Sequence, residues 1–293
     1  MVKPTCFQNI LLADDGSEHA RAAIQLLLKL PLSLETQITV LRVFGSQQST
    51  EVFAIETAIN ETCTMLQKKG FRAKPELLLG SPAEKIIEYT DQHHPDLVVL
   101  GAKGLRATLG ILLGGVAQQV IEYASCPVLV VRAPVKRLRR ILLVVDGSQN
   151  SQNAVKCMVQ FPYPAQADFR LMHVLSPQYP PVFTDLPYGL PAEQPSKVDE
   201  EVARQRAAEE AEGNRLLVKM KELLAAGEIT VTTELKQGDA ATEIIEYVKK
   251  NQIDLIVAGS RGLSRVRSWL LGSVSRKLVH YSGCSVLIVR GQW

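Results

Sequence analysis

A glycine pattern of the form G-x2-G-x9-G occurs twice in the sequence, each time directly after a short apolar run. The copy in the second half follows the run DLIVA and ends in a serine; its members are Gly259, Gly262, Gly272 and Ser273. Glycines let the backbone turn tightly and approach a ligand without a Cβ atom in the way. A helix that begins at such a loop presents N–H groups and partial positive charge to an anion. The pattern therefore predicts a phosphate-binding loop.

The copy in the first half follows the run DLVVL and keeps the same spacing with Gly101, Gly104 and Gly114. Its fourth position is Gly115 instead of a serine, and Ala117 stands where the second half has Ser275. Each lost hydroxyl hydrogen bond is worth about 0.5–1.5 kcal/mol, and more when the acceptor is charged. We therefore expect the first copy to be a weaker site, although its backbone donors remain.

The residues that complete such a site fall at the ends of other predicted strands. An aspartate follows the first apolar run of each half (Asp15 and Asp146), and a valine lies on the second run (Val43 and Val174). Ligands of parallel α/β sheets bind beyond the carboxyl ends of the strands, where the strand order reverses. An aspartate there can accept hydrogen bonds from a base or sugar, and a valine gives an apolar surface for a ring. The start of the last helix adds N–H and hydroxyl donors from Ser273, Val274 and Ser275.

The whole chain contains one unit twice. Two pairs of segments show the repeat: NILLADDGSEHA, from Asn9, aligns with RILLVVDGSQNS, from Arg140, and CPVLVVR aligns with CSVLIVR. Matched segments lie further apart in the later part of the unit, so the second half holds an insertion, at about residues 176–197, which is rich in proline. The insertion is interpreted in three ways: a lid over a ligand, a docking arm for a protein partner, or a loop without a packed core.

Each half alternates strands with helices in the same order. The first strand, at 10–13 or 141–145, ends at Asp-Gly-Ser, whose serines (Ser17 and Ser148) suit the N-cap position of a helix. Alternation continued to a fifth strand predicts parallel sheets with right-handed crossovers. Nearly continuous apolar runs indicate strands that are covered on both faces. We therefore predict two tandem, doubly wound, five-stranded parallel α/β sandwich domains, over residues 1–135 and 136–293.

Composition argues against several classes of protein. A net charge of +3 is too small to indicate nucleic-acid binding. No apolar run approaches the roughly 18 residues that span a bilayer, and the N-terminus lacks a signal-peptide pattern. The cysteines are scattered without C-x2-C spacing, which favours reduced thiols, and Cys126 and Cys284 are expected to be packed rather than redox-active. We expect a cytoplasmic protein with no membrane or nucleic-acid partner and no metal site of its own.

With these motifs the chain resembles the universal stress protein family, and specifically its tandem-domain members. The resemblance implies a Rossmann-like α/β fold that binds ATP or another adenine nucleotide (AMP or ADP), usually with Mg²⁺ held through the phosphates. It places the adenine near Asp146 and Val174 and the phosphates on the glycine loop. It also implies antiparallel pairing of residues 128–131 with residues 286–289, which would make the two halves a pseudo-dimer within one chain. A further homodimer of the two-domain chain is left open.

Three functions are consistent with these residues. The first is a stress-response sensor or regulator that binds an adenine nucleotide mainly through its second half. The second is a slow ATPase or autophosphorylating enzyme, with Ser273 or Ser275 near the γ-phosphate. The third is a nucleotide-independent scaffold that binds protein partners through the insertion. The sequence contains no Ser-His-Asp constellation and no lysine-bearing phosphate loop, so no catalytic residue is assigned.

Overall fold

The computed structural model describes residues 7–45, 52–105, 113–135, 138–176, 197–262, 271–291 and 293, with the backbone alone for 197–199 and 201. The predicted insertion lies almost wholly outside these residues. The first half consists, in chain order, of β1 (Asn9–Ala13), α1 (Glu18–Lys29), β2 (Gln37–Phe44), α2 (Val52–Lys68), β3 (Arg72–Leu79), α3 (Pro82–His93), β4 (Leu97–Gly101), α4 (Gly115–Tyr123) and β5 (Val128–Val131).

The second half repeats this order of elements, with a much longer second helix. It consists of β6 (Arg140–Val144), α5 (Gln149–Gln160), β7 (Asp168–Leu175), α6 (Lys197–Ala226), β8 (Val231–Gln237), α7 (Ala240–Asn251), β9 (Leu255–Gly259), α8 (Ser273–Tyr281) and β10 (Ser285–Val289).

The ten strands of the described residues form one sheet, in the order β3-β2-β1-β4-β5-β10-β9-β6-β7-β8. Neighbouring strands within each half are parallel, which confirms the predicted doubly wound α/β fold. The halves meet at β5 and β10, which pair antiparallel with Val130 opposite Val286 and Val128 opposite Ile288. Strand order reverses between β1 and β4 and again between β6 and β9, so each half has a switch point at the carboxyl ends of its strands.

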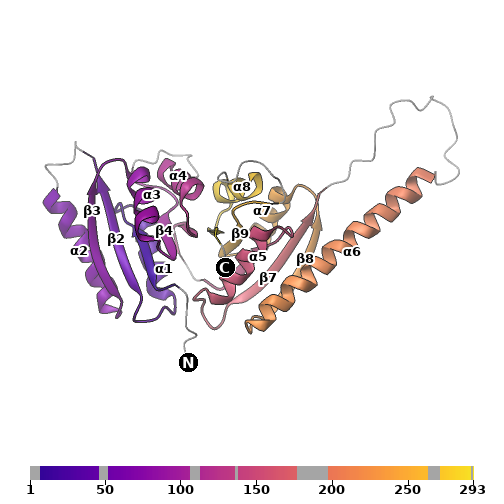
Figure 1. Ribbon diagram of the computed structural model, residues 1–293, viewed down its shortest axis with the longest axis horizontal. Helices are drawn as coiled ribbons and strands as arrows, with labels where there is room; N and C mark the ends of the chain where they lie inside the picture. The colour runs from indigo at the N-terminus through magenta and orange to yellow at the C-terminus, as the bar shows by residue number, and fades with distance from the viewer. Residues whose placement is uncertain are drawn as a thin grey trace.

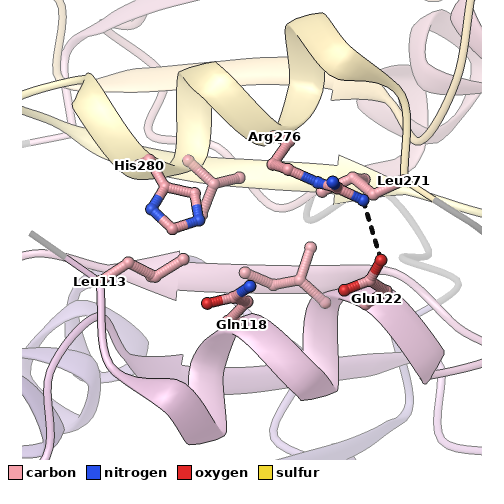
Figure 2. Close-up of a pocket in the computed structure, with 8 residues that line it drawn as sticks. Leu113, Gln118, Glu122, Leu271, Arg276 and His280 are labelled. Atoms are coloured by element: carbon pink, nitrogen blue, oxygen red, sulfur yellow. Dashed lines mark hydrogen bonds and ion pairs between the residues drawn. The ribbon is translucent and has the colours of Figure 1, made fainter.

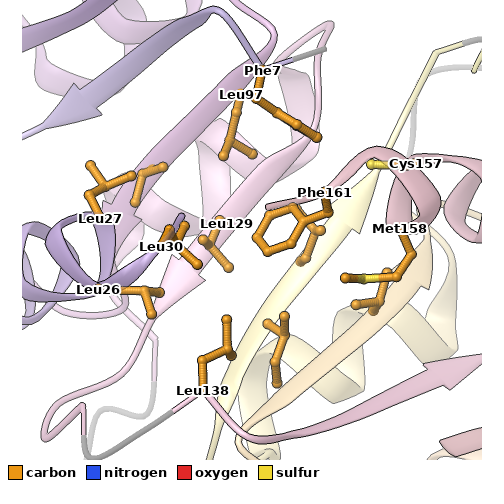
Figure 3. Close-up of a cluster of buried hydrophobic side chains, with 14 of the residues drawn as sticks. Phe7, Leu26, Leu27, Leu30, Leu97, Leu129, Leu138, Cys157, Met158 and Phe161 are labelled. Atoms are coloured by element: carbon orange, nitrogen blue, oxygen red, sulfur yellow. The ribbon is translucent and has the colours of Figure 1, made fainter. Parts of the chain in front are cut away.

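Helices cover both faces of the sheet (Figure 1). Helices α1, α2, α5 and α6 share one apolar core with the strands, and α3, α4, α7 and α8 share the other. The first core crosses from one half to the other (Figure 3). The ring of Phe7 meets that of Phe161 edge-on at a centroid distance of 5.5 Å and stacks on Trp293 at 5.3 Å. The two halves are therefore joined by side-chain packing as well as by the sheet.

Two arginines at equivalent positions fasten each half to the last helix of the other. Arg132, just after β5, donates through Nη2 to the carbonyl of Val279 at 2.6 Å. Arg290, just after β10, donates through Nη2 to the carbonyl of Ile121 at 2.9 Å. Burial lowers the pKa of both guanidinium groups below the usual value. The reciprocal contacts describe a pseudo-twofold relation between the halves.

Helices α4 and α8 face each other across this junction (Figure 2), where Arg276 pairs with Glu122 at 2.9 Å. The hollow between the two helices measures about 10 Å³ and is lined in part by Leu113 and Leu271. A volume of that size holds at most one water molecule. The junction is a packed interface and offers no room for a nucleotide.

Candidate functional site

The turn after the first strand of each half carries an aspartate toward the glycine loop. In the second half, Oδ1 of Asp146 accepts a hydrogen bond from the N–H of Ser148 at 3.0 Å. In the first half, Asp15 accepts the same bond from Ser17 at 3.0 Å, and its Oδ2 accepts a second bond from the N–H of Leu105 at 3.1 Å. The first-half aspartate thereby links the β1 turn to the loop that follows β4.

Ser17 and Ser148 cap the following helices as predicted. Their hydroxyl oxygens accept from N–H groups in the first turns of α1 (3.1 Å) and α5 (3.2 Å). Each hydroxyl also donates to a carbonyl of the glycine loop, that of Lys103 at 3.1 Å or Arg261 at 3.2 Å. One serine thus fixes both the helix start and the loop beside it.

The first glycine of each pattern is needed where a strand packs against a helix. A Cβ on Gly101 would lie 2.7 Å from the backbone carbonyl carbon of His19 in α1. A Cβ on Gly259 would lie 2.6 Å from that of Asn150 in α5. The sequence pattern predicts Gly259 as a point where the backbone approaches a ligand, and the structure shows that the close approach of α5 also requires a glycine there.

The second glycine of each pattern lies against the aspartate of the same half. A Cβ on Gly104 would lie 2.6 Å from Oδ2 of Asp15, and Gly262 faces Oδ2 of Asp146 in the same way. The structure therefore brings together the strand-one aspartate and the glycine loop, two features that are more than 80 residues apart in either half.

The helices that follow the glycine loops begin without a side-chain cap. Gly114 and Gly272 occupy the N-cap positions of α4 and α8. The first backbone hydrogen bond of the α8 turn joins the N–H of Arg276 to the carbonyl of Gly272 at 2.9 Å. The N–H groups of Ser273, Val274 and Ser275 therefore have no partner within the helix. A free helix N-terminus of this kind attracts anions.

Ser273 and Ser275 differ in what their hydroxyl groups can do. Ser275 is buried, and its Oγ donates to the carbonyl of Gly259 at 2.8 Å. A hydroxyl has a single proton, so this one is not available to a phosphate. Ser273 is exposed, and within the described residues its hydroxyl has no partner. The expectation that both hydroxyls donate to phosphate is thus corrected for Ser275, which braces β9 against α8.

The two valines lie at the same end of the sheet as the aspartates, where the parallel strands have their carboxyl ends. The N–H of Asp14 donates to the carbonyl of Leu41 at 2.9 Å, which fixes the end of β1 against β2, and the second half repeats this bond. Val43 and Val174 follow shortly afterwards on β2 and β7. Both are half-buried and pack against the core on the side of α3 and α7.

A buried polar group in the first half was not predicted from the sequence. Asp14 is 4 % exposed, and its carboxylate accepts from the N–H of Gly16 at 2.9 Å and from the hydroxyl of Thr62 at 3.0 Å. The guanidinium of Arg42 lies 3.6 Å from the same carboxylate, and its Nε donates to the carbonyl of Asp14 at 2.9 Å. The strand end beside Asp15 is thereby held by an ion pair.

At the equivalent strand end, the second half has buried apolar side chains in place of the ion pair. Val145 and Met220 are buried there, and His173 lies 2.8 Å through Nδ1 from the carbonyl of Val145. The sequence contains a signal for this difference, because Asp-Asp-Gly in the first half aligns with Val-Asp-Gly in the second. It could not be interpreted without knowing that the first residue of each triplet points into the protein.

Within the described ranges, no group of three or more His, Cys, Asp or Glu residues is placed to hold a metal ion. Over the same part of the chain, no helix is long and apolar enough to cross a membrane.

Comparison with known proteins agrees with this geometry. The family model described as the universal stress protein family matches the chain twice, at residues 7–132 and 137–290. The chain belongs to the universal stress protein family. A universal stress protein of Bacillus subtilis is 33% identical over 151 residues, which cover 52% of this chain and 98% of that protein. One of Mycolicibacterium smegmatis is 32% identical over 151 residues, covering 52% of this chain and 48% of its own length.

Solved structures extend the agreement to the tandem arrangement. The crystal structure of a universal stress protein from Archaeoglobus fulgidus covers 97% of this chain and 96% of its own, with a TM-score of 0.67 at 19% identity. A Pseudomonas aeruginosa protein of unknown function covers 97% of this chain and 93% of its own, with a TM-score of 0.70 at 14% identity. At these identities the likeness shows that the tandem universal stress protein fold is shared.

Proposed function

We propose that the chain binds ATP or another adenine nucleotide, mainly through its second half, and acts as a nucleotide-dependent sensor or regulator in a stress response. The observation that supports this most is the uncapped N-terminus of α8 beside Asp146, at a switch point of the sheet. In this proposal the N–H groups of α8 and the hydroxyl of Ser273 hold the phosphates. Asp146 and Val174 offer a carboxylate and an apolar surface to the nucleoside.

The first half is proposed as the weaker of two sites. It keeps Asp15 and Val43, and its loop keeps Gly101, Gly104, Gly114 and Gly115. Because the Ser275 hydroxyl is used inside the protein, the side-chain donors of the two helix starts differ by one hydroxyl, that of Ser273. A hydrogen bond to a charged acceptor is worth about 1.5–3 kcal/mol, which corresponds to about tenfold to a hundredfold in affinity.

Mg²⁺ fits this proposal as a partner of the bound phosphates. The described residues offer no cluster of acidic ligands, and the carboxylate of Asp146 lies against Gly262 of the loop. Mg²⁺ is commonly held by one or two carboxylates together with substrate phosphates and water. Its contribution would be to neutralise phosphate charge, while the protein's own groups orient the nucleotide.

Equilibrium dialysis with labelled ATP tests the site. Replacing Gly272→Val together with Ser273→Ala should remove most of the tight binding, because a side chain then crowds the loop and the hydroxyl is lost. The matched change in the first half, Gly114→Val with Gly115→Ala, should leave the tight site intact. Unchanged ATP affinity in a second-half variant that is folded by circular dichroism would reject the assignment.

A second function, slow autophosphorylation or ATP hydrolysis, is supported by one observation. The exposed hydroxyl of Ser273 lies at the start of α8, whereas that of Ser275 is engaged. Incubation with labelled Mg-ATP should then label the wild-type protein and leave a Ser273→Ala variant unlabelled. Labelling that persists in this variant would remove Ser273 from consideration, and phosphate release that does not scale with protein would remove the activity.

Location and partners form a separate part of the proposal. We place the protein in the cytoplasm, in keeping with four described cysteines that form no disulfide. We further infer that the proline-rich insertion engages protein partners, and a homodimer of the chain stays a prediction. Deleting residues 177–195 should abolish partner capture while ATP binding survives, and sedimentation velocity gives the oligomeric state.

A further inference from the structure

A polar hollow of about 320 Å³ lies between the edge strand β3 and helix α3 of the first half. Its lining includes Glu76, Leu78 and Leu79 from the strand and Tyr89 and His93 from the helix. These residues lie along the side of the outermost strand, whereas the proposed nucleotide site is at the ends of β1 and β4. The hollow therefore needs an explanation of its own.

In the second half, an arginine bonds to the counterparts of Tyr89 and His93. Nη1 of Arg170, on β7, donates to Oη of Tyr247 at 3.0 Å and to Oδ1 of Asn251 at 2.7 Å. Tyr247 in turn donates to Oε1 of Glu234 at 3.0 Å, and Nε of Arg170 lies 3.5 Å from Asp168. The guanidinium carbon is 5.8 Å from the centre of the Tyr247 ring. Tyr247, Asn251 and Asp168 therefore bind one guanidinium group directly, and Glu234 orients Tyr247.

The strand registers establish that the two places are equivalent. On β8, Glu234 lies two residues beyond the position opposite Arg170. On β3, Glu76 lies two residues beyond the position opposite Thr39. Thr39 therefore stands at the arginine position of the first half, and it has no guanidinium to offer to the residues that line the hollow.

The helix supplies a hydrogen-bond acceptor at the equivalent position in both halves. Asn251 donates through Nδ2 to the carbonyl of Tyr247 at 3.0 Å, which leaves its Oδ1 to accept from the arginine. His93, the last residue of α3, lies 3.2 Å through Nδ1 from the carbonyl of Tyr89. With Nδ1 donating to that carbonyl, Nε2 of the neutral imidazole is an acceptor. His93 can thus accept a hydrogen bond from a guanidinium group, as Asn251 does in the second half.

The carboxylate of Glu76 lacks the hydrogen bond that its counterpart, Glu234, accepts from Tyr247. It is half-buried, and the described part of the chain gives it no hydrogen bond or ion pair. The Tyr89 hydroxyl lies 3.3 Å from Oγ1 of Thr39, which it takes as its acceptor. Lys85 and Glu88, also in the lining, pair with each other at 2.7 Å and balance in charge. The hollow therefore keeps the negative charge of Glu76.

We propose that this hollow binds a guanidinium group, carried by a small molecule or by an arginine side chain of another polypeptide. In the second half, the counterparts of Tyr89 and His93 bond to the guanidinium of Arg170. A guanidinium fork binds a carboxylate through parallel hydrogen bonds, and the Glu76 carboxylate lines the hollow beside Tyr89 and His93. One acidic neighbour differs, since Gln37 stands at the place of Asp168, so we expect weak binding, with a dissociation constant of about 1 mM.

A titration of the full chain with N-methylguanidinium, followed by methyl NMR of Leu78 and Leu79, tests the proposal. Both leucines should shift and saturate, beyond any change caused by potassium chloride at equal ionic strength. Glu76→Gln should weaken binding about tenfold, because the charged acceptor is lost. Glu84→Gln, on the exposed side of α3, is the matched control and should bind as the wild type does.

Thr39→Arg gives the sharpest variant, because its guanidinium should occupy the acceptors on α3, as Arg170 does on α7, and abolish the shifts. If that variant does not fold, the comparison of Glu76→Gln with Glu84→Gln still tests whether the hollow binds a guanidinium group. Butylammonium should bind more weakly than N-methylguanidinium, and equal binding would overturn the guanidinium class. Equal shifts in wild type and Glu76→Gln, or shifts that never saturate, would overturn the site.

A further comparison distinguishes a small molecule from a polypeptide as the carrier of the guanidinium group. A capped arginine that binds no more tightly than N-methylguanidinium supports a small-molecule ligand. Tighter binding by an arginine-containing peptide than by its lysine analogue supports a polypeptide ligand. ATP binding is measured on the same samples and should be unaffected by these variants, so this test is independent of the proposed nucleotide site.

Discussion

At the scale of single residues, the two serines at the start of α8 are separated by burial. The hydroxyl of Ser275 lies against the carbonyl of Gly259, and that of Ser273 lies in solvent. Their first-half counterparts, Ala117 and Gly115, therefore remove two different things. The first removes an internal brace between strand and helix, and the second removes a donor at the helix end.

We expect Ser273→Ala to weaken ATP binding about tenfold with little change in stability, because it deletes an exposed donor to a charged ligand. Ser275→Ala should lower the free energy of unfolding by about 1 kcal/mol, because it leaves a buried carbonyl with one bond fewer. Urea denaturation and equilibrium dialysis on both variants measure the two effects. Reversal of the pattern, with Ser275→Ala the stronger effect on binding, would contradict the assignment.

The cysteines give a second prediction at this scale. Burial raises the pKa of both Cys126 and Cys284 to about 12, and that of Cys63 to about 11. The thiolate is the reactive form, and at pH 8 its population at these sites is very small. In a Cys6→Ser variant, we expect the remaining thiols to react slowly with a disulfide reagent until denaturant is added. Rapid labelling of native Cys126 or Cys284 would instead indicate a redox-active thiol.

At the scale of elements, equivalent helices of the two halves start differently. Oδ1 of Asp239 caps α7 by accepting from the N–H and the hydroxyl of Thr242, at 3.0 and 2.7 Å. Ser81, the N-cap of α3, makes no such bond. The bonds from Thr242 lower the pKa of Asp239 below its ordinary value of 3.8. A carboxyl group whose pKa is lowered by folding stabilises the protein above its unfolded pKa and stops doing so as the pH falls.

Asp239→Ala should therefore cost about 1 kcal/mol at pH 7, and the cost should shrink as the pH falls below about 4. Ser81→Ala, its counterpart in the first half, should cost much less at either pH. Thermal melts of the wild type and both variants at pH 7 and pH 3.5 give the comparison. An equal loss from Asp239→Ala at both pH values would mean that the carboxylate charge is not what stabilises α7.

At the scale of the whole molecule, one sheet and one continuous core join the halves. Strands β5 and β10 pair across the junction, and Phe7 of the first half packs on Phe161 and Trp293 of the second. Domains that share a core unfold together, because neither can expose its part of the interface without loss to the other. The arginine contacts from Arg132 and Arg290 add polar links to the same junction.

We accordingly expect one unfolding transition for the chain. Phe161→Ala should move the whole transition, at a cost of about 3–5 kcal/mol, because Phe161 is 2% exposed at the centre of this core. Phe53→Ala is the control, since that ring is 83% exposed. Calorimetry and circular dichroism measure the effect. Two separated transitions, with only one of them shifted, would show that the halves fold independently.

The sequence by itself determined the repeated unit, the order of strands and helices along it, and the ends of strands where chemistry is expected. Apolar runs, Ser17 and Ser148 as caps, and the spacing of the glycines are local signals, because each depends on neighbours along the chain. They sufficed to predict the α/β fold, and the family resemblance added the antiparallel meeting of the fifth strands. They also placed Asp15 and Asp146 at the ends of the first strands, where the structure brings the glycine loops against them.

The tertiary structure alone decided which side chains are free. Whether a hydroxyl such as that of Ser275 faces solvent or a carbonyl depends on a strand that lies elsewhere in the sequence. The buried pair of Asp14 and Arg42, the hollow beside Glu76, and the bond between Arg170 and Tyr247 arise in the same way. Residue type sets what a group can bind, but only the packing of distant segments determines whether its partner is already inside the protein.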